Sequence, residues 1–525
     1  MKNILQSKYF FYSFLIIYLI VGIFLSLNVG ITHDEIHSNW VWELNKKKLS
    51  NIFFNSNYDI SYLSTYHGYY GIGFYLVSTP IELIFSKITG LININYEGGV
   101  LLLKHPTVFL FFLITGIYFR KIMNLILNDK IFSNLSTILF LTYPYLLGHS
   151  LFNIKDTPFM SIWLVCTYYL IKNLNNFFFK SKLKYKDLSI LALLTAYLLS
   201  LRINGVLIFL EYMIFLIVYL NIFKLNLFTF LKVLKNKILF FLIIFISSVY
   251  ILYPSFWMDP LKFIESVDFF GNISQTVCTV TLGECMKTQD IPASYLFIWM
   301  FFKLPILILI GLILFPLVEK NLLSKKENKL ILGSLIITVT SIILLFVLLR
   351  INLYDELRQV LFLFPLIFII SLISIFSFKK KLSNTLIIFY IIFFLINNFK
   401  IYPFNYLWLN NFNHFINVNK NFEKDYWGIS TKLVANYFNK EKIGKKDCII
   451  SNRIDGISYF LNNENTCLKT LYEMHKKNNR PFYVALTERA LNKGTPNKCD
   501  LVKVVSTKIN FGTENISLAT IYKCS

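Results

Sequence analysis

Charged residues are scarce in this chain of 525 amino acids. They make up 15% of the sequence, whereas hydrophobic residues make up 55% and aromatic residues 18%. A water-soluble globular protein needs about 25% charged residues to cover its surface, so the composition excludes that class. Apolar runs of about 20 residues recur along the chain, and each is long enough to cross a bilayer as a helix.

Acidic residues are scarcer still. The chain has 29 Asp and Glu against 52 Lys and Arg, which gives a formal net charge of +23. A protein that binds nucleic acid gathers its basic residues into one domain or groove. Here they lie in the gaps between apolar runs, so we predict no nucleic-acid partner. In a membrane protein, Lys and Arg in short loops indicate the cytoplasmic side.

The apolar runs predict a polytopic, all-α membrane protein with about eleven transmembrane helices. The first run follows Lys2 and Lys8, which places the N-terminus in the cytoplasm. It has no small-residue cleavage site and is interpreted as an uncleaved anchor. The predicted spans lie near residues 9–28, 101–119, 132–148, 157–173, 187–202, 204–221, 238–253, 293–317, 330–349, 358–377 and 382–399.

One apolar stretch, Tyr69–Ile88, decides the topology. It contains Pro80 and Glu82, and if it crossed the membrane every later basic cluster would lie outside, against the orientation rule. If it lies along the interface, all of them become cytoplasmic together, and we prefer this interpretation. The clusters are Arg120 and Lys121, Lys180–Lys186, Lys232–Lys237, Lys320–Lys329 and Lys379–Lys381.

Cysteine is also rare, with seven residues in the chain. On this topology Cys166 alone lies in a span, and the other six lie outside, where disulfides persist. An even number of outer cysteines can pair, but the sequence leaves the connectivity open. The outer cysteines are Cys278, Cys285, Cys448, Cys467, Cys499 and Cys524.

The composition changes after residue 400. Residues 1–400 form the predicted transmembrane domain, with a first outer loop at 29–100 that contains interfacial helices. In residues 401–525 apolar runs are shorter, and "KDCIISN", "FYVALTE" and "LATIYKC" are typical of short strands among helical patterns such as "STKLVANYFNK". We therefore predict a small C-terminal α/β domain in the periplasm of a bacterium, outside its inner membrane.

Polar residues gather at the outer ends of the predicted spans. Charges are costly inside a bilayer, so such residues suggest a functional site. They are Asp34 and Glu35, Tyr66 and His67, His149, Lys155 and Asp156, Arg202, Asp259, Arg350, and Asp355, Glu356 and Arg358. Carboxylates and cations are thus predicted to converge on one face of the membrane.

The segment "HDEIH" at 33–37 has two alternative explanations. His33 and His37 share a helical face at the i, i+4 spacing of a zinc protease, with Asp34 near the position of its general base. That base is usually Glu, no third ligand with family spacing is evident, and Gly30 suggests a loop. The other alternative is a solvated helix cap with Asp34 at the N-terminus. We predict no metal ligands here; a divalent cation beside Asp34 and Glu35 is possible, but the residues do not indicate one.

Glycosyl transfer from a lipid phosphate explains the same residues better. The reaction needs a carboxylate to deprotonate the acceptor hydroxyl and cations to stabilise the leaving phosphate. Asp34 is the candidate base, and Lys155, Arg202 and Arg358 are the candidate cations. The alternatives are an ion pair between Lys155 and Asp156, and arginines that extend to the membrane interface.

The order of these parts resembles the membrane glycosyltransferases of the GT-C superfamily, which includes the protein O-mannosyltransferases and the lipid A aminoarabinose transferase. The matching segments are "HDEIHSNWVWEL", "STYHGYYGIGFYL" and "LLGHSLFNIKDTPFM". More specifically, four shorter segments look like a bacterial subfamily that is similar to dolichyl-phosphate-mannose-protein mannosyltransferases. They are "LRINGVL", "YDELRQVLFLFP", "YPFNYLWLN" and "EKDYWGISTK".

The resemblance implies a GT-C fold, a polyprenyl-phosphate sugar donor and an inverting hexosyl or pentosyl transfer on the outer face. It implies Asp34 as general base with Glu35 assisting, and no certain cofactor. His67, Asp156 and Asp355 are then substrate-binding candidates. The acceptor would be a glycan, a lipid or a protein. The chain lacks the prolines that usually accompany the histidine at "YHGYYG".

Two other classes of protein are compatible with many spans and charged residues. A transporter or flippase usually shows internal repeats and interrupted helices, and the sequence shows neither. An assembly protein without chemistry of its own is the third alternative. The charges gather at span ends beside long outer loops, which favours an enzyme that binds two substrates.

Overall fold

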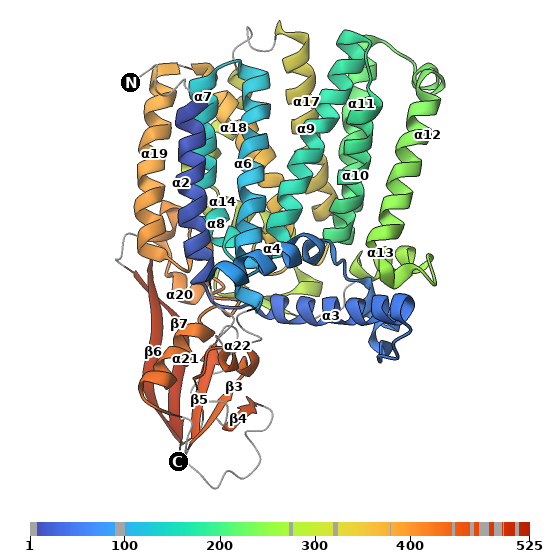
Figure 1. The fold of residues 1–525 in the computed structure, drawn as a ribbon. Coiled ribbons are helices and arrows are strands. Elements are labelled where there is room, and N and C mark those ends of the chain that lie inside the picture. The colour runs from blue at the N-terminus through green and yellow to red at the C-terminus, as the bar shows by residue number, and fades with distance from the viewer. Residues whose placement is uncertain are drawn as a thin grey trace.

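The computed structural model describes residues 8–89, 100–271, 277–318, 324–378, 380–443, 447–462, 467–471, 482–487, 496, 498–509 and 514–524. It consists of a helical bundle, three helices that cross one end of the bundle, and a sheet domain at that same end (Figure 1). Lys320 and Lys379 from the predicted basic clusters lie outside the described residues.

Helices occur at every predicted span. The bundle contains α2 (Lys8–Leu27), α6 (His105–Leu127), α7 (Lys130–Thr142), α8 (Pro144–Ser150), α9 (Asp156–Lys180), α10 (Tyr185–Leu201), α11 (Ile208–Phe223), α12 (Leu227–Leu252), α14 (Ser294–Lys303), α15 (Ile306–Ile313), α17 (Lys326–Leu348), α18 (Phe364–Phe378) and α19 (Lys380–Ile401). Within the described residues, 6 helices are long and apolar enough to cross a membrane, or up to 8 if two bent pairs each form one span.

The two bent pairs differ from the straight spans that the sequence predicts. Helices α7 and α8 meet at 64° before Pro144, and α14 and α15 meet at 119° on either side of Leu304 and Pro305. Proline has no backbone N–H and clashes with the preceding turn, so a helix cannot continue straight through it. The prediction of one uninterrupted helix over 293–317, and of no interrupted helix in the chain, is therefore wrong.

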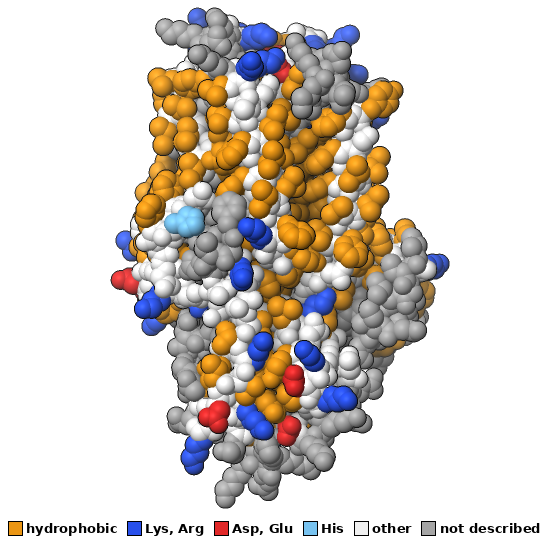
Figure 2. All heavy atoms as spheres, turned by 90° about the vertical axis from the view of Figure 1, so that its left-hand side faces the viewer, with side chains coloured by type: hydrophobic (Ala, Val, Ile, Leu, Met, Phe, Trp, Pro, Cys, Tyr) orange, Lys and Arg blue, Asp and Glu red, His pale blue; other side chains and the backbone are white. Residues whose placement is uncertain are grey.

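Apolar side chains cover the outside of the bundle as well as its inside. Phe24, Ile246 and Phe399 are exposed, and Figure 2 shows a broad hydrophobic band around the flank that contains α19. Large apolar surfaces of this kind are unfavourable in water and indicate contact with lipid. Inside, Phe119 stacks on Phe140 with ring centroids 4.7 Å apart, and Trp163 is fully buried.

The helix α4 (Gly73–Thr89) runs across the bundle and not along it (Figure 1). At one end Gly73 packs closely on Ser200 at the end of α10, and further along Glu82 forms an ion pair with Lys104 just before α6. Both contacts lie at the end of the bundle nearest the sheet domain. This placement agrees with the interfacial interpretation of residues 69–88.

Two further helices, α3 (His33–Phe54) and α13 (Lys262–Gly271), also lie across this end of the bundle (Figure 1). The loops between α9 and α10, between α11 and α12, and between α18 and α19 lie at the opposite end. Residues 180–186 surround the first of these loops. The other clusters lie within helices: Arg120 and Lys121 towards the end of α6, residues 232–237 towards the start of α12, and Lys326, Lys329, Lys380 and Lys381 at the starts of α17 and α19. The structure thus separates these clusters from α3, as the charge pattern predicts.

The C-terminal sheet domain has five strands in the order β4-β3-β5-β7-β6. Strand β3 (Cys448–Ser451) pairs in parallel with β4 (Cys467–Thr470) and β5 (Phe482–Thr487), and β7 (Glu514–Cys524) pairs antiparallel with β5 and β6 (Cys499–Ile509). Helices α21 (Thr431–Lys440) and α22 (Ile454–Ser458) pack beside it. Disulfides join β3 to β4 and β6 to β7, at Cys448–Cys467 and Cys499–Cys524.

The core of the sheet domain begins later than the predicted boundary at residue 401. Tyr406, Trp408, Tyr426 and Trp427 belong to the hydrophobic core of the bundle, whereas Val434 is the first residue in the core of the sheet. The intervening segment, which includes α20 (Val418–Asn421), therefore packs with the bundle and connects it to the sheet domain.

Candidate active site

A cavity of about 690 Å³ lies where the bundle, the crossing helices and the sheet domain meet. Its walls include five residues singled out from the sequence, which come from four separate parts of the chain: Asp34, Lys155, Arg202, Asp355 and Arg358. Carboxylates and guanidinium groups rarely share a partly buried cavity without a functional reason. The predicted convergence of charges is thus present in the structure.

The start of α3 places Asp34 at the cavity. Thr32 caps the helix: its hydroxyl accepts the Glu35 N–H at 3.2 Å, and the Glu35 carboxylate accepts the Thr32 N–H at 2.7 Å, which forms a capping box. Gly30 precedes this turn because a Cβ there would lie 2.3 Å from the Ile429 carbonyl oxygen. The C-terminal segment thereby determines where α3 begins.

Two cations hold the Asp34 carboxylate. Its Oδ2 lies 3.1 Å from Arg358 Nη1 and 3.6 Å from Lys155 Nζ, and 28% of the side chain is exposed to the cavity. Burial favours the neutral acid, but the charges of Lys155 and Arg358 outweigh it and hold the pKa of Asp34 well below its usual range. Asp34 is therefore a carboxylate at physiological pH.

Glu35 has a different environment from Asp34, although it is the next residue. Its side chain is 1% exposed, and Oε1 lies 2.5 Å from His105 Nε2 on α6 while Oε2 completes the capping box. It does not line the cavity. The structure therefore gives Glu35 a structural role and corrects its assignment as a second catalytic carboxylate.

Replacing Glu35 by Ala is expected to reduce the folding stability by about 1 to 3 kcal/mol, because the buried His105 ring nitrogen would lose its hydrogen-bond partner. Thermal unfolding of the purified protein in detergent measures the effect. Glu43→Ala is the matched control on the same helix, since Glu43 is exposed and pairs with Lys46 at the surface, where such pairs contribute little. Equal melting temperatures for the two variants would contradict the structural role.

The neighbours Lys155 and Asp156 do not pair with each other. Lys155 lies at the cap of α9 and contacts Asp34, whereas Asp156 forms an ion pair with Arg202, the residue that follows α10. The Asp156 carboxylate also accepts a hydrogen bond from Asn153 at 2.9 Å and is almost fully buried. Asp156 does not line the cavity itself; it pairs with Arg202, which does.

Arg358 is the most enclosed of the three cations, with 8% of its side chain exposed. Its guanidinium lies 4.8 Å from the ring centroid of Tyr354 and 4.6 Å from that of Trp427. Asp355 Oδ2 lies 3.2 Å from Nη2, so the guanidinium bridges Asp355 and Asp34. Aromatic faces and carboxylates together hold the planar group in one orientation.

Histidine and aromatic side chains also line the cavity. His37 Nε2 lies 3.1 Å from His67 Nδ1, and burial together with the charge of Lys155 lowers the pKa of His37 to about 4. His37 is therefore neutral. His67 lies behind His37 and does not line the cavity, so a direct substrate contact by His67 is not what the structure shows. Tyr66 stacks on Phe269 of α13.

Four further cavity residues are not singled out by the sequence analysis, although the first three lie in segments quoted for the family resemblance: Tyr70, Tyr354, Trp427 and Arg453. Arg453 comes from the sheet domain, just before α22. Burial lowers the pKa of His33, and the charge of Arg453 lowers it further. Aromatic residues are frequent throughout this chain, so the sequence alone cannot select Tyr70, Tyr354 and Trp427. Only the docking of the sheet domain brings Arg453 to the cavity.

Metal ligands do not cluster in the described part of the chain. Among those residues, no three His, Cys, Asp or Glu side chains are grouped so that they could hold an ion. Lys155 and Arg358 engage the Asp34 carboxylate, and His105 engages that of Glu35.

The fold and the cavity together define a polytopic helical membrane protein with a polar site at one membrane face. Neither a protein family nor a curated protein matches the sequence. Among solved structures, the chain is similar to ArnT from Cupriavidus metallidurans in the apo state, with a TM-score of 0.51, 9% identity and 97% of each chain covered. The same ArnT bound to undecaprenyl phosphate gives a TM-score of 0.46, 9% identity and 98% coverage of each chain.

The chain therefore has the fold of ArnT over nearly its whole length, sheet domain included. At 9% identity the similarity concerns the arrangement of helices and strands, and the chemistry has to be argued from the cavity itself.

Proposed function

We propose that this protein is a GT-C glycosyltransferase of the bacterial inner membrane. It transfers a sugar from a polyprenyl-phosphate donor to an acceptor on the periplasmic face. The N-terminus is cytoplasmic, and the sheet domain is periplasmic. The observation that carries the proposal is the cluster of Lys155, Arg202 and Arg358 around the Asp34 carboxylate in one cavity at the interfacial end of the bundle.

The three cations bind the donor phosphate. Arginine grips phosphate through two parallel hydrogen bonds, and lysine adds a compact point charge. Arg202 and Arg358 are oriented by Asp156 and Asp355, so their guanidinium groups are preorganised before the donor arrives. Such preorganised charges stabilise the negative charge that grows on the leaving phosphate.

Asp34 is the general base. The acceptor hydroxyl attacks the anomeric carbon, its proton passes to the Asp34 carboxylate, and the bond to the phosphate oxygen breaks as polyprenyl phosphate leaves. Attack opposite to the phosphate inverts the configuration. An entering phosphate competes with Asp34 for Lys155 and Arg358, so the cations then stabilise the carboxylate less. The pKa of Asp34 consequently rises towards a value suited to a base.

Of the candidate substrate-binding residues, Asp355 lines the cavity, and we assign it the contact with the sugar. Asp156 and His67 act through Arg202 and His37 and are positioning residues.

The break between α14 and α15 is the feature that a transporter would share. It lies beside Lys303, whose ammonium is fully buried against Glu356 at 2.7 Å and the Tyr406 carbonyl oxygen at 2.9 Å. This cation is thus already paired inside the protein, and none of these three residues lines the cavity. The break therefore gives no specific support to transport.

Mass spectrometry of surface glycans from a strain that lacks the protein tests the proposal. We expect the loss of one sugar, whose attachment site identifies donor and acceptor together. Transfer by the purified full-length protein in lipid nanodiscs, with the polyprenyl-phosphate form of that sugar, should restore the linkage. Unchanged glycans in the deletion strain would contradict a transferase.

The pH profile of kcat/KM reports the ionisations of the free enzyme. Because the pKa of Asp34 is lowered, the carboxylate persists as the pH falls, and the acidic limb is expected below about pH 4, where a free aspartate titrates. Burial lowers the pKa of Lys155, so its charge is lost early as the pH rises, and the basic limb is expected below about pH 10.4. Initial rates from pH 3 to 10 check both limbs, and an acidic limb near pH 6 would contradict Asp34.

A further inference from the structure

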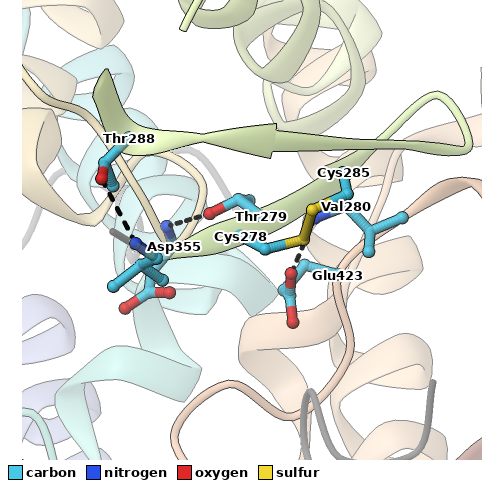
Figure 3. The surroundings of a disulfide bond; sticks show 8 residues. Cys278, Thr279, Val280, Cys285, Thr288, Asp355 and Glu423 are labelled. Carbon is cyan, nitrogen blue, oxygen red and sulfur yellow. Dashed lines mark hydrogen bonds between the residues drawn. A yellow bond between two sulfur atoms is a disulfide. The ribbon is translucent and has the colours of Figure 1, made fainter. Parts of the chain in front are cut away.

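A small disulfide-bonded hairpin supports the loop that carries Arg358. Strands β1 (Cys278–Thr281) and β2 (Glu284–Lys287) pair antiparallel, and Cys278 is bonded to Cys285 (Figure 3). The hairpin lies between the loop that contains Asp355 and the segment that contains Glu423. It belongs neither to the bundle nor to the sheet domain, and it contacts the bundle on one side and the C-terminal segment on the other.

Backbone and side-chain hydrogen bonds hold the hairpin on both sides. Thr279 is fully buried, and its hydroxyl oxygen accepts the backbone N–H of Asp355 at 3.3 Å (Figure 3). On the other side Val280 N–H donates to Glu423 Oε2 at 2.8 Å, and Glu423 N–H donates to the Val280 carbonyl oxygen at 2.9 Å. Thr281 accepts the indole N–H of Trp299 at 3.0 Å.

The loop at Asp355 depends on such support. Asp355 and Glu356 have φ angles of 56° and 64°, in the left-handed region that residues other than glycine rarely adopt. Surrounding contacts must maintain this conformation. The Glu356 N–H donates to the Tyr295 hydroxyl at 3.0 Å, and the Asp355 N–H donates to Thr279. Contacts on both residues thus keep the Asp355 side chain directed at Arg358.

The contacts form a continuous path to the reacting groups. Thr279 binds the backbone of Asp355, the Asp355 carboxylate binds Arg358 Nη2 at 3.2 Å, and Arg358 Nη1 binds Asp34 at 3.1 Å. A guanidinium that must grip phosphate in two places tolerates little displacement. A shift of the Asp355 backbone would therefore move the cation out of alignment.

We propose that Thr279 is a positioning residue for Arg358, and that the Cys278–Cys285 disulfide keeps Thr279 in place, so that donor binding depends on the oxidised hairpin. This inference rests on the proposed function, since it assigns Arg358 to the donor phosphate. Thr279 contacts no substrate itself, and its effect is transmitted through Asp355.

The test measures the affinity of purified full-length protein in nanodiscs for undecaprenyl phosphate. Thr279→Val keeps the shape of the side chain but removes its hydroxyl, and we expect about threefold to tenfold weaker binding, the usual effect of one lost hydrogen bond. In transfer assays kcat/KM for the donor should fall to a similar extent, because Arg358 also stabilises the charge on the leaving phosphate. Thr279→Ser restores the hydroxyl and should restore the affinity, which a purely structural defect would not show.

The disulfide is tested by replacing both cysteines, as Cys278→Ser with Cys285→Ser. The matched control is Cys499→Ser with Cys524→Ser, which removes a disulfide from the sheet domain at a distance from the loop. We expect weaker donor binding in the first double variant only. Mild reduction of the wild-type protein after folding should weaken binding in the same way, and this measurement requires no variant to fold.

Each other outcome overturns a distinct claim. If the wild-type protein binds undecaprenyl phosphate and Thr279→Val binds it equally well, the positioning role is wrong and the proposed function stands. If both double cysteine variants lose affinity to the same extent, the hairpin has no specific role. If the wild-type protein binds no polyprenyl phosphate, the proposed function and this inference both fail.

Discussion

Asp34→Asn is expected to abolish sugar transfer, with a loss of about 10²-fold to 10⁴-fold in kcat, because the amide cannot accept the proton of the acceptor hydroxyl. The substitution keeps the size of the side chain and the helix cap, since Thr32 and Glu35 form the capping box. The fold should therefore persist. Transfer rates of the purified variant, with its melting temperature, measure both effects.

Donor binding distinguishes a general base from a binding residue. Asp34 competes for Lys155 and Arg358, so removing its charge should leave the affinity for undecaprenyl phosphate unchanged or increase it. The matched control is Glu43→Gln, which removes a carboxylate from the exposed face of the same helix and should retain full activity. Normal transfer by Asp34→Asn would refute the proposed base, and weaker donor binding would refute the competition.

Arg358→Ala should reduce kcat/KM by about 10²-fold to 10³-fold, the usual cost of removing one preorganised group that stabilises transition-state charge. It also removes one of the two cations beside Asp34, so the pKa of Asp34 should rise and the acidic limb of the pH profile should move to higher pH. Initial rates and undecaprenyl phosphate affinity, measured across pH, report both consequences.

Arg358→Lys tests whether the planar group matters. Lysine keeps the charge but loses the two parallel hydrogen bonds and the contacts with Tyr354 and Trp427, so we expect only partial recovery. Arg350→Ala is the control, because Arg350 is an exposed arginine of the same loop that does not line the cavity. Equal activities of the Arg350 and Arg358 alanine variants would exclude a specific role for Arg358.

Much of the fold could be predicted because membrane helices are determined locally. A chain in lipid must satisfy its own backbone hydrogen bonds, so a run of about 20 apolar residues becomes a helix wherever it occurs. The two helix bends were not predicted from the sequence. Pro305 lies in a run that composition alone marks as one span, and the direction taken after the break depends on the helices packed around it.

The candidate site shows the same division. Asp34, Lys155, Arg202 and Arg358 could be selected from the sequence, because a charge at the end of an apolar run is costly and therefore informative. The ion pairs that these residues form could not be predicted from the sequence. Lys155 precedes Asp156 directly, yet Lys155 pairs with Asp34 and Asp156 pairs with Arg202, two residues that are distant in the chain.

The sequence by itself determined the membrane class, the helical segments, the interfacial stretch before α6 and the set of charged residues at one face. Only the tertiary structure decided that Asp34 faces the cavity while Glu35 is buried against His105, that Arg453 arrives from the sheet domain, and that a disulfide hairpin supports Asp355. The physical reason is the distance in sequence over which each interaction acts. A membrane helix is formed by an apolar run and by hydrogen bonds within that run, whereas ion pairs and packing depend on which distant segments come into contact.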